Sequence, residues 1–192
     1  MGRILETPTS FLEVDKCDQE LLELLKSKKE ELKAQLERRP KIIVYNKEVE
    51  QPRNVGFFSD TIQGYNYSKK VIQSKPLTKE LKQILNYINK KYAAEFNGIL
   101  INYYKDGNDY IGMHCDNEEE LDKIGVVSLS IGATRKFRIR TKQKKIVLDY
   151  QIKKGDILLM AGTFQEEFYH EIPKQKTVKE ERISLTFRKH QI

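Results

Sequence analysis

The second half of the chain, from Gly98 onward, consists of short strand-like segments separated by turn signals, and this pattern restricts the fold more than any other feature. Turns are indicated at residues 105–108 and 153–156, where Lys-Asp-Gly-Asn and Lys-Lys-Gly-Asp follow apolar runs. Many short strands with regular turns are typical of an antiparallel sandwich or jelly roll. The expected strands are Ile99–Tyr104, Tyr110–His114, Val126–Ile131, Arg135–Arg140, Lys145–Tyr150, Asp156–Met160, Phe164–Glu171 and Arg182–Arg188.

The first half of the chain mixes helical and strand-like segments. A leucine-rich amphipathic helix is expected over Asp18–Arg39, ended by Pro40, and a second helix over Thr78–Glu95. Between them, residues 41–49 indicate a hairpin, and residues 51–68 indicate an irregular segment rich in aromatic side chains. The chain is therefore expected to be an α+β protein, mainly β, that forms one domain.

A His-x-Asp motif, His114-Cys115-Asp116, lies at the end of one expected strand. Side chains alternate along a strand, so His114 and Asp116 project from the same face. A distant second histidine, His170, can complete a set of three ligands. Two histidines and one carboxylate with an open face are the arrangement of non-haem Fe(II) oxygenases. The alternative interpretation of His114 is a buried structural histidine.

Two arginines mark the last expected strand. Arg182 and Arg188 lie on one face of it, and Ile183, Leu185 and Phe187 lie on the other. Arginine binds a dicarboxylate through paired, charge-assisted hydrogen bonds. The alternative is a strand face exposed to solvent.

The net charge of +7, with 35 lysines and arginines, favours a polyanionic partner, and nucleic acid is the first candidate. Plain solubility explains the same charge equally well. Two cysteines, Cys17 and Cys115, are too few for a disulfide scaffold and suit a reducing compartment. The sequence contains neither a membrane-length apolar run nor a signal-peptide pattern, so an intracellular, soluble protein is expected, in nucleus or cytoplasm.

Three stretches together resemble the AlkB family of Fe(II)- and 2-oxoglutarate-dependent dioxygenases, and in particular its animal member that repairs duplex DNA. They are Asn102-Tyr103-Tyr104-Lys105-Asp106-Gly107, Gly112-Met113-His114-Cys115-Asp116 and Arg182-Ile183-Ser184-Leu185-Thr186-Phe187-Arg188. The resemblance implies a double-stranded β-helix, or jelly roll, with N-terminal helices and a nucleotide-recognition lid. Residues 1–40 would then form a helical extension, residues 41–97 the lid, and residues 98–192 the catalytic core.

The resemblance also implies roles for individual residues. Iron would be bound by His114, Asp116 and His170, and 2-oxoglutarate by Asn102, Tyr104, Arg182 and Arg188. Ser184 stands where the family usually has asparagine, which weakens one polar contact near the co-substrate. The substrate would contact Glu118 beside the exocyclic amine of the target base, together with Tyr45, Arg53, Phe58, Tyr65 and Tyr67.

The implied function is oxidative demethylation of 1-methyladenine and 3-methylcytosine in DNA, with release of formaldehyde. It would use Fe(II), 2-oxoglutarate and O₂, with ascorbate as the reductant in vitro. Tyr45 aligns with a finger that enters duplex DNA, so duplex DNA is the expected substrate of a monomeric enzyme that acts away from membranes. The alternatives are a demethylase of RNA or single-stranded DNA, a non-catalytic nucleic-acid-binding jelly roll, and a protein hydroxylase.

Overall fold

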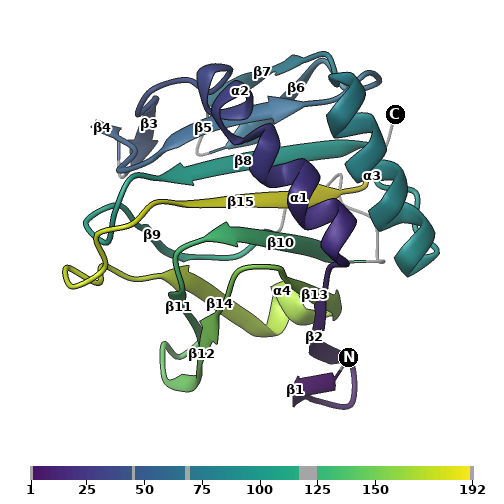
Figure 1. The fold of residues 1–192 in the computed structure, drawn as a ribbon. Helices are drawn as coiled ribbons and strands as arrows, with labels where there is room; N and C mark the ends of the chain where they lie inside the picture. The colour runs from purple at the N-terminus through teal and green to yellow at the C-terminus, as the bar shows by residue number, and fades with distance from the viewer. Residues whose placement is uncertain (1, 45, 68–69, 117–124, 191–192) are drawn as a thin grey trace.

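The computed structural model describes residues 2–44, 46–67, 70–116 and 125–190, and within these the strands form two facing sheets and one separate hairpin (Figure 1). The larger sheet has the order β1 (Gly2–Glu6), β2 (Ser10–Lys16), β13 (Asp156–Gly162), β10 (Val126–Gly132), β15 (Arg182–Arg188), β8 (Gly98–Tyr104), β5 (Asn54–Phe58), β7 (Lys70–Lys75) and β6 (Gly64–Tyr67). The smaller sheet has the order β12 (Ile146–Ile152), β11 (Arg135–Thr141), β14 (Phe168–Ile172) and β9 (Ile111–His114). The hairpin pairs β3 (Lys41–Val44) with β4 (Lys47–Glu50).

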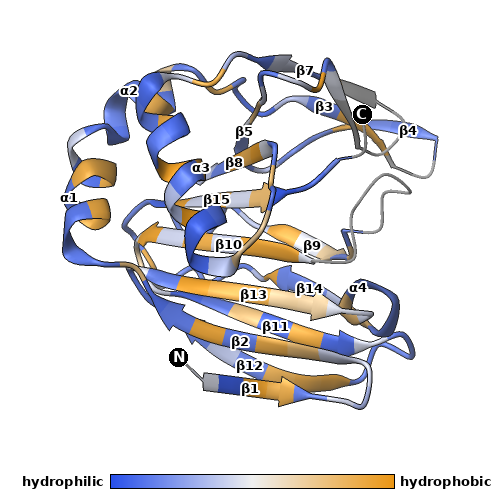
Figure 2. Cartoon of the chain, turned by 90° about the vertical axis from the view of Figure 1, so that its right-hand side faces the viewer, coloured by the Kyte–Doolittle hydropathy of each residue, from blue (hydrophilic) through white to orange (hydrophobic). Residues whose placement is uncertain are grey.

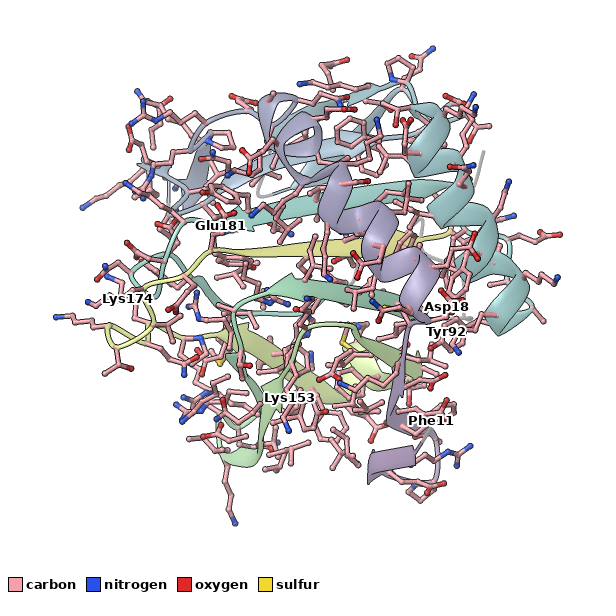
Figure 3. The ribbon with its side chains drawn as sticks, in the orientation of Figure 1. Phe11, Asp18, Tyr92, Lys153, Lys174 and Glu181 are labelled. Atoms are coloured by element: carbon pink, nitrogen blue, oxygen red, sulfur yellow. The ribbon has the colours of Figure 1, made fainter. Side chains whose placement is uncertain are left out.

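Helices cover the outer face of the larger sheet (Figure 1). They are α1 (Gln19–Ser27), α2 (Lys29–Ala34) and α3 (Lys79–Tyr92), whereas the short α4 (Phe164–Glu167) precedes β14. The side chains of Asp18 and Thr78 cap α1 and α3, each accepting a backbone N–H three residues on. Figure 3 labels Asp18 and the last residue of α3, Tyr92, at the lower ends of the two helices. None of the helices in the described ranges is long and apolar enough to span a membrane.

Two apolar clusters lie on opposite faces of the larger sheet, and Figure 2 shows the apolar residues spread along its strands. Leu25, Ile84 and Phe187 belong to the cluster beneath the helices. Phe137 and Met160 belong to the cluster between the two sheets. Because side chains alternate along β15, its odd residues face the helices and its even residues face the space between the sheets. The predicted jelly roll is confirmed. The candidate co-substrate residues of β15 lie on its inner face, between the sheets.

Several boundaries differ from those expected. The predicted helix Asp18–Arg39 is divided at Lys28, where the Ser27 hydroxyl donates to the Leu24 carbonyl and competes with a continued helix. The N-terminal segment is helical only in part, because β2 alternates Leu12 and Val14 with polar residues and pairs with both β1 and β13 in the larger sheet.

Two other segments have a different secondary structure from the one expected. Residues 51–68, expected to be irregular, contain β5 and β6, and β5 pairs with β8 within the larger sheet. The expected strand Phe164–Glu171 begins with α4 and becomes extended only at Phe168. In addition, α3, which belongs to the expected lid segment, contributes apolar side chains to the cluster beneath the helices. In each case pairing or packing with distant segments decides the local structure.

Candidate metal and co-substrate site

His114, Asp116 and His170 come together at one end of the smaller sheet. His114 ends β9 and lies directly opposite His170 on β14, because the two strands are antiparallel neighbours. Asp116 follows β9 by two residues, and one ligand atom from each of the three residues lies within 4.8 Å of the others. The Nε2 atoms of His114 and His170 lie 3.9 and 3.7 Å from the Asp116 carboxylate oxygens.

The charge states of these three side chains suit a divalent metal. Burial lowers the pKa of both imidazoles, that of His170 to about 3, so both are neutral near pH 7. The His114 Nδ1 atom lies 2.9 Å from the Gly112 carbonyl oxygen, which leaves Nε2 directed toward Asp116. Burial opposes ionisation of Asp116, but Arg188 beside it, with Nη2 2.6 Å from Oδ1, and the two histidines hold its pKa below its usual value.

Neutral imidazoles and an ionised carboxylate are the protonation states that bind a metal. Two nitrogen donors and one oxygen donor, gathered at the edge of a pocket, also match the ligand set of mononuclear Fe(II) sites. The residues present therefore fit a resident iron.

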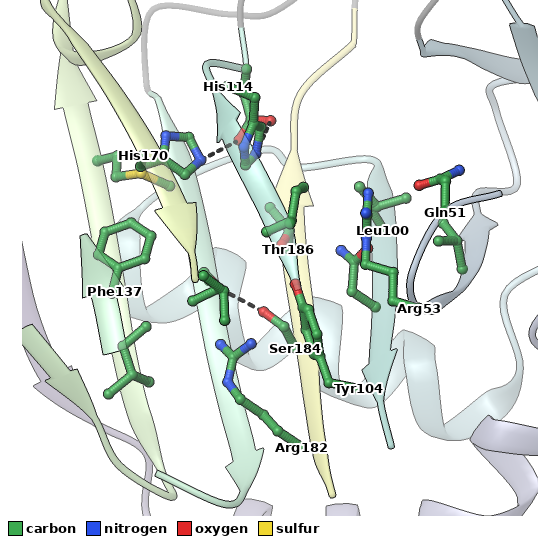
Figure 4. Close-up of a pocket in the computed structure, with 18 of the residues that line it drawn as sticks. Gln51, Arg53, Leu100, Tyr104, His114, Phe137, His170, Arg182, Ser184 and Thr186 are labelled. Carbon is green, nitrogen blue, oxygen red and sulfur yellow. Dashed lines mark hydrogen bonds and ion pairs between the residues drawn. The ribbon is translucent and has the colours of Figure 1, made fainter. Parts of the chain in front are cut away.

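A pocket between the sheets extends from these three residues to Arg182 on β15 (Figure 4). Arg182 is 2% exposed, and its Nε donates to the Ser130 hydroxyl at 2.9 Å. Its guanidinium carbon lies 5.2 Å from the centre of the Tyr104 ring. In the part of the chain that is described, Arg182 forms no ion pair, and its Nη1 is buried without a hydrogen-bond partner. A buried cation with a vacant donor fits the carboxylate of an incoming acid.

Asn102 and Ser184 line the same pocket from opposite positions on β8 and β15. Asn102 accepts a hydrogen bond from Arg53 Nε at 2.7 Å, and the hydroxyls of Ser184 and Ser128 lie 3.0 Å apart. The structure thus brings every predicted iron and co-substrate residue to one cavity. Arg188 lies beside Asp116, one of the three candidate ligands, and Arg53, expected to contact substrate, lies beside Asn102.

The residues predicted to contact the substrate do not all lie at the pocket. Tyr45 and Glu118 lie outside the described residues, and Tyr65 and Tyr67 belong to β6, the outermost strand of the larger sheet. The prediction that Phe58 contacts the substrate is wrong, because its side chain is fully buried in the cluster beneath the helices. Val55 lines the pocket, so alternation along β5 turns Phe58 to the opposite face.

Sequence reasoning missed Gln165, which supports the metal ligands. Its side-chain Oε1 accepts the backbone N–H of Asp116 at 2.9 Å. The helix that carries it, α4, is held by Lys142, whose Nζ donates to the Gln165 and Phe168 carbonyls. The pattern of residues 164–171 predicts a strand and carries no motif at Gln165, whereas in the structure the helical turn of α4 places this side chain beside Asp116.

Replacing Gln165 with leucine is expected to weaken iron binding about tenfold, the low end of what loss of an outer-shell partner costs, because Asp116 loses the bond that orients it. Anaerobic titration with Fe(II) measures this change. Gln175→Leu is the matched control: Gln175 also accepts a backbone N–H, that of Lys136, but away from the metal ligands. Equal affinities in the two variants would contradict a positioning role for Gln165.

Comparisons with known proteins agree with this geometry. A family model described as the 2OG-Fe(II) oxygenase superfamily matches residues 11–188. The DNA oxidative demethylase ALKBH2 of Bos taurus is 33% identical over 159 residues, which cover 78% of this chain and 57% of that protein. The alpha-ketoglutarate-dependent dioxygenase alkB homolog 3 of Homo sapiens is 31% identical over 154 residues, covering 72% of this chain and 52% of that protein.

The chain therefore spans little more than half the length of these two relatives. Among solved structures, that of OsALKBH1 superposes with a TM-score of 0.57 at 15% identity, covering 96% of this chain and all of that one, which bears on the fold alone. The family match over residues 11–188, with the similarity to ALKBH2 and alkB homolog 3, shows that the chain belongs to the 2OG-Fe(II) oxygenase superfamily and, within it, to the AlkB family.

Proposed function

We propose that this protein is an Fe(II)- and 2-oxoglutarate-dependent dioxygenase that removes methyl groups from the bases of DNA. The observation that carries the proposal is one pocket that holds both a candidate three-ligand metal site and a buried arginine that forms no ion pair with any described residue. The names of the relatives, a DNA oxidative demethylase and an alpha-ketoglutarate-dependent dioxygenase, support the same activity.

Different side chains of the pocket would bind the metal and the co-substrate. His114, Asp116 and His170 would hold iron, while Arg182 and Tyr104 would bind the distal carboxylate of 2-oxoglutarate at the far end. Asn102 and Ser184 lie between these two ends and offer polar contacts to the co-substrate. Bound iron, with 2-oxoglutarate and O₂, supplies the oxidation that hydroxylates an N-methyl group, after which formaldehyde is released. Arg188 keeps Asp116 ionised for this site.

The proposed substrates are 1-methyladenine and 3-methylcytosine in duplex DNA. The hairpin of β3 and β4 supports duplex binding, because it exposes Lys41, Lys47 and Val49, and Tyr45 occurs in the sequence between its strands. An aromatic side chain can replace a flipped base in the stack, and the lysines can contact phosphates. Tyr65, Tyr67 and Glu118 remain proposed contacts of the flipped base.

Formaldehyde release tests the proposal. Matched oligonucleotides that carry 1-methyladenine, as duplex DNA, single-stranded DNA and RNA, are incubated with Fe(II), 2-oxoglutarate, ascorbate and the protein. Release that is fastest from the duplex is the expected result. Release from single-stranded DNA or RNA alone would support the demethylase chemistry but show that duplex DNA is not the substrate. Turnover of 2-oxoglutarate without release from any of them would show that the substrate is of another class.

Tyr45→Ala is expected to lower activity on duplex DNA about tenfold more than on single-stranded DNA. Stacking on an aromatic ring contributes roughly 1–3 kcal/mol per base, and only the duplex has a gap to fill when the base leaves the stack. The ratio of kcat/KM for the two oligonucleotides measures this effect. An equal loss on both would show that Tyr45 has a structural role.

A further inference from the structure

Gln51 is a buried residue whose polar side-chain atoms form no hydrogen bond with any residue that the structure describes. It follows β4 directly, and its backbone N–H donates to the Pro40 carbonyl at 3.0 Å, so its main chain is anchored. The residue is 1% exposed. Both its amide Nε2 and its amide Oε1 are buried, and neither has a hydrogen-bond partner within the described ranges.

An unpaired buried amide is unfavourable, because its donor and acceptor have lost water without gaining a partner. Val55, Ile72 and Leu100 line the same pocket and are apolar, so they offer the amide no partner. The nearest polar side chains of that wall are already engaged with each other, Arg53 donating to Asn102. A native protein that keeps such a group is expected to use it on a ligand.

The position of Gln51 indicates that this ligand is the substrate. It lines the pocket of the metal ligands and also a neighbouring cavity under the hairpin, to which Pro40, Ile42 and Lys75 contribute. In Figure 4, Gln51 and Arg53 lie on the side of the pocket opposite Phe137 and His170, and Arg182 lies apart from both. The amide is therefore on the wall that is free for substrate once iron and 2-oxoglutarate occupy their proposed places.

We propose that Gln51 reads a methylated adenine through the edge formed by its amino group N6 and ring nitrogen N7. This inference rests on the proposed demethylase function. A glutamine amide presents one acceptor and one donor side by side, and adenine offers the complementary pair on that edge. A methyl group at N1 leaves both atoms free. Cytosine has the amino donor but lacks the adjacent ring acceptor, so Gln51 favours adenine over cytosine.

The test compares formaldehyde release from the same duplex carrying either 1-methyladenine or 3-methylcytosine. Gln51→Met preserves side-chain length and removes both hydrogen-bonding groups. We expect it to lower kcat/KM for 1-methyladenine about tenfold more than for 3-methylcytosine, mainly through KM. Gln51→Glu keeps an acceptor and removes the donor, and is expected to shift the ratio in the same direction.

A stability measurement separates recognition from structure. Because the buried amide of Gln51 has no hydrogen-bond partner among the described residues, Gln51→Met is expected to leave the melting temperature of the free protein unchanged or raise it. Gln73→Met is the matched control, since Gln73 is an exposed residue that lines only the neighbouring cavity, and it is expected to change neither the ratio nor the melting temperature.

The outcomes distinguish this inference from the function on which it rests. One outcome is that the wild type demethylates both bases and Gln51→Met loses kcat/KM equally for both. This would overturn the recognition of adenine by Gln51 and leave the proposed demethylase activity unaffected. A lower melting temperature together with equal losses would assign Gln51 to structure. A wild-type protein that releases formaldehyde from neither oligonucleotide would overturn the proposed function, and the role of Gln51 with it.

Discussion

Replacing His114 with alanine is expected to abolish the turnover of 2-oxoglutarate and the release of formaldehyde while the protein stays folded. The His114 side chain is 19% exposed and contacts the Gly112 carbonyl oxygen and the His170 ring, so its removal leaves a small gap in the lining of the pocket. One of three proposed metal ligands is lost, which costs more affinity than the roughly 10–100-fold that follows loss of an outer-shell partner. Anaerobic Fe(II) titration and turnover of 2-oxoglutarate measure the two effects.

Substitutions at Asp116 separate ligation from stability. Asp116 accepts a hydrogen bond from buried Arg188, so Asp116→Ala is expected to lower the melting temperature as well as remove a ligand. Asp116→Asn keeps an oxygen for Arg188 and removes the charge, so it is expected to melt nearer the wild type and to be inactive. Full-rate turnover in His114→Ala or Asp116→Asn would remove the metal assignment.

The residues of the candidate metal and co-substrate site could be brought together from the sequence because all of them except Asp116, which follows β9, lie on regular strands. His114 and His170 face each other in adjacent antiparallel strands, and Arg182, Ser184 and Arg188 share the inner face of β15. Alternation along a strand depends only on the backbone, so a correct strand assignment fixes the face on which each side chain lies. The starts of the two helices, expected at Asp18 and Thr78, are similarly local, and both side chains cap their helices in the structure.

The positions of other residues could not be predicted, because they depend on contacts between segments that are distant in the sequence. Phe58 belongs to an aromatic-rich stretch, but pairing of β5 with β8 decides that it faces the helices. Gln51 and Gln165 have no motif, and their positions follow from how a hairpin and a short helix pack on the pocket. His190 has no motif either, yet it is 1% exposed and its ring packs nearly perpendicular to that of Phe57. Burial at such positions is a property of the assembled fold.

Arg182→Met is expected to raise the KM for 2-oxoglutarate about a hundredfold, because truncating one partner of a buried charge pair costs roughly 2–5 kcal/mol. The same variant should lose the stabilisation that the co-substrate gives. At a hundred times its Kd a ligand contributes about 2.7 kcal/mol. In a protein of 192 residues this corresponds to about 5–10 °C in Tm. Thermal melting with and without 2-oxoglutarate measures this difference without any need for turnover.

Without the co-substrate, Arg182→Met should melt no lower than the wild type, because it removes a buried charge that has no ion-pair partner among the described residues. Arg135→Met is the matched control. Arg135 is equally buried beside Tyr104, but it donates to the backbone carbonyls of Asp106, Asp109 and Pro173. Its loss should therefore destabilise the fold and leave the affinity for 2-oxoglutarate nearly unchanged. If 2-oxoglutarate stabilised Arg182→Met as much as the wild type, the co-substrate would have to bind elsewhere.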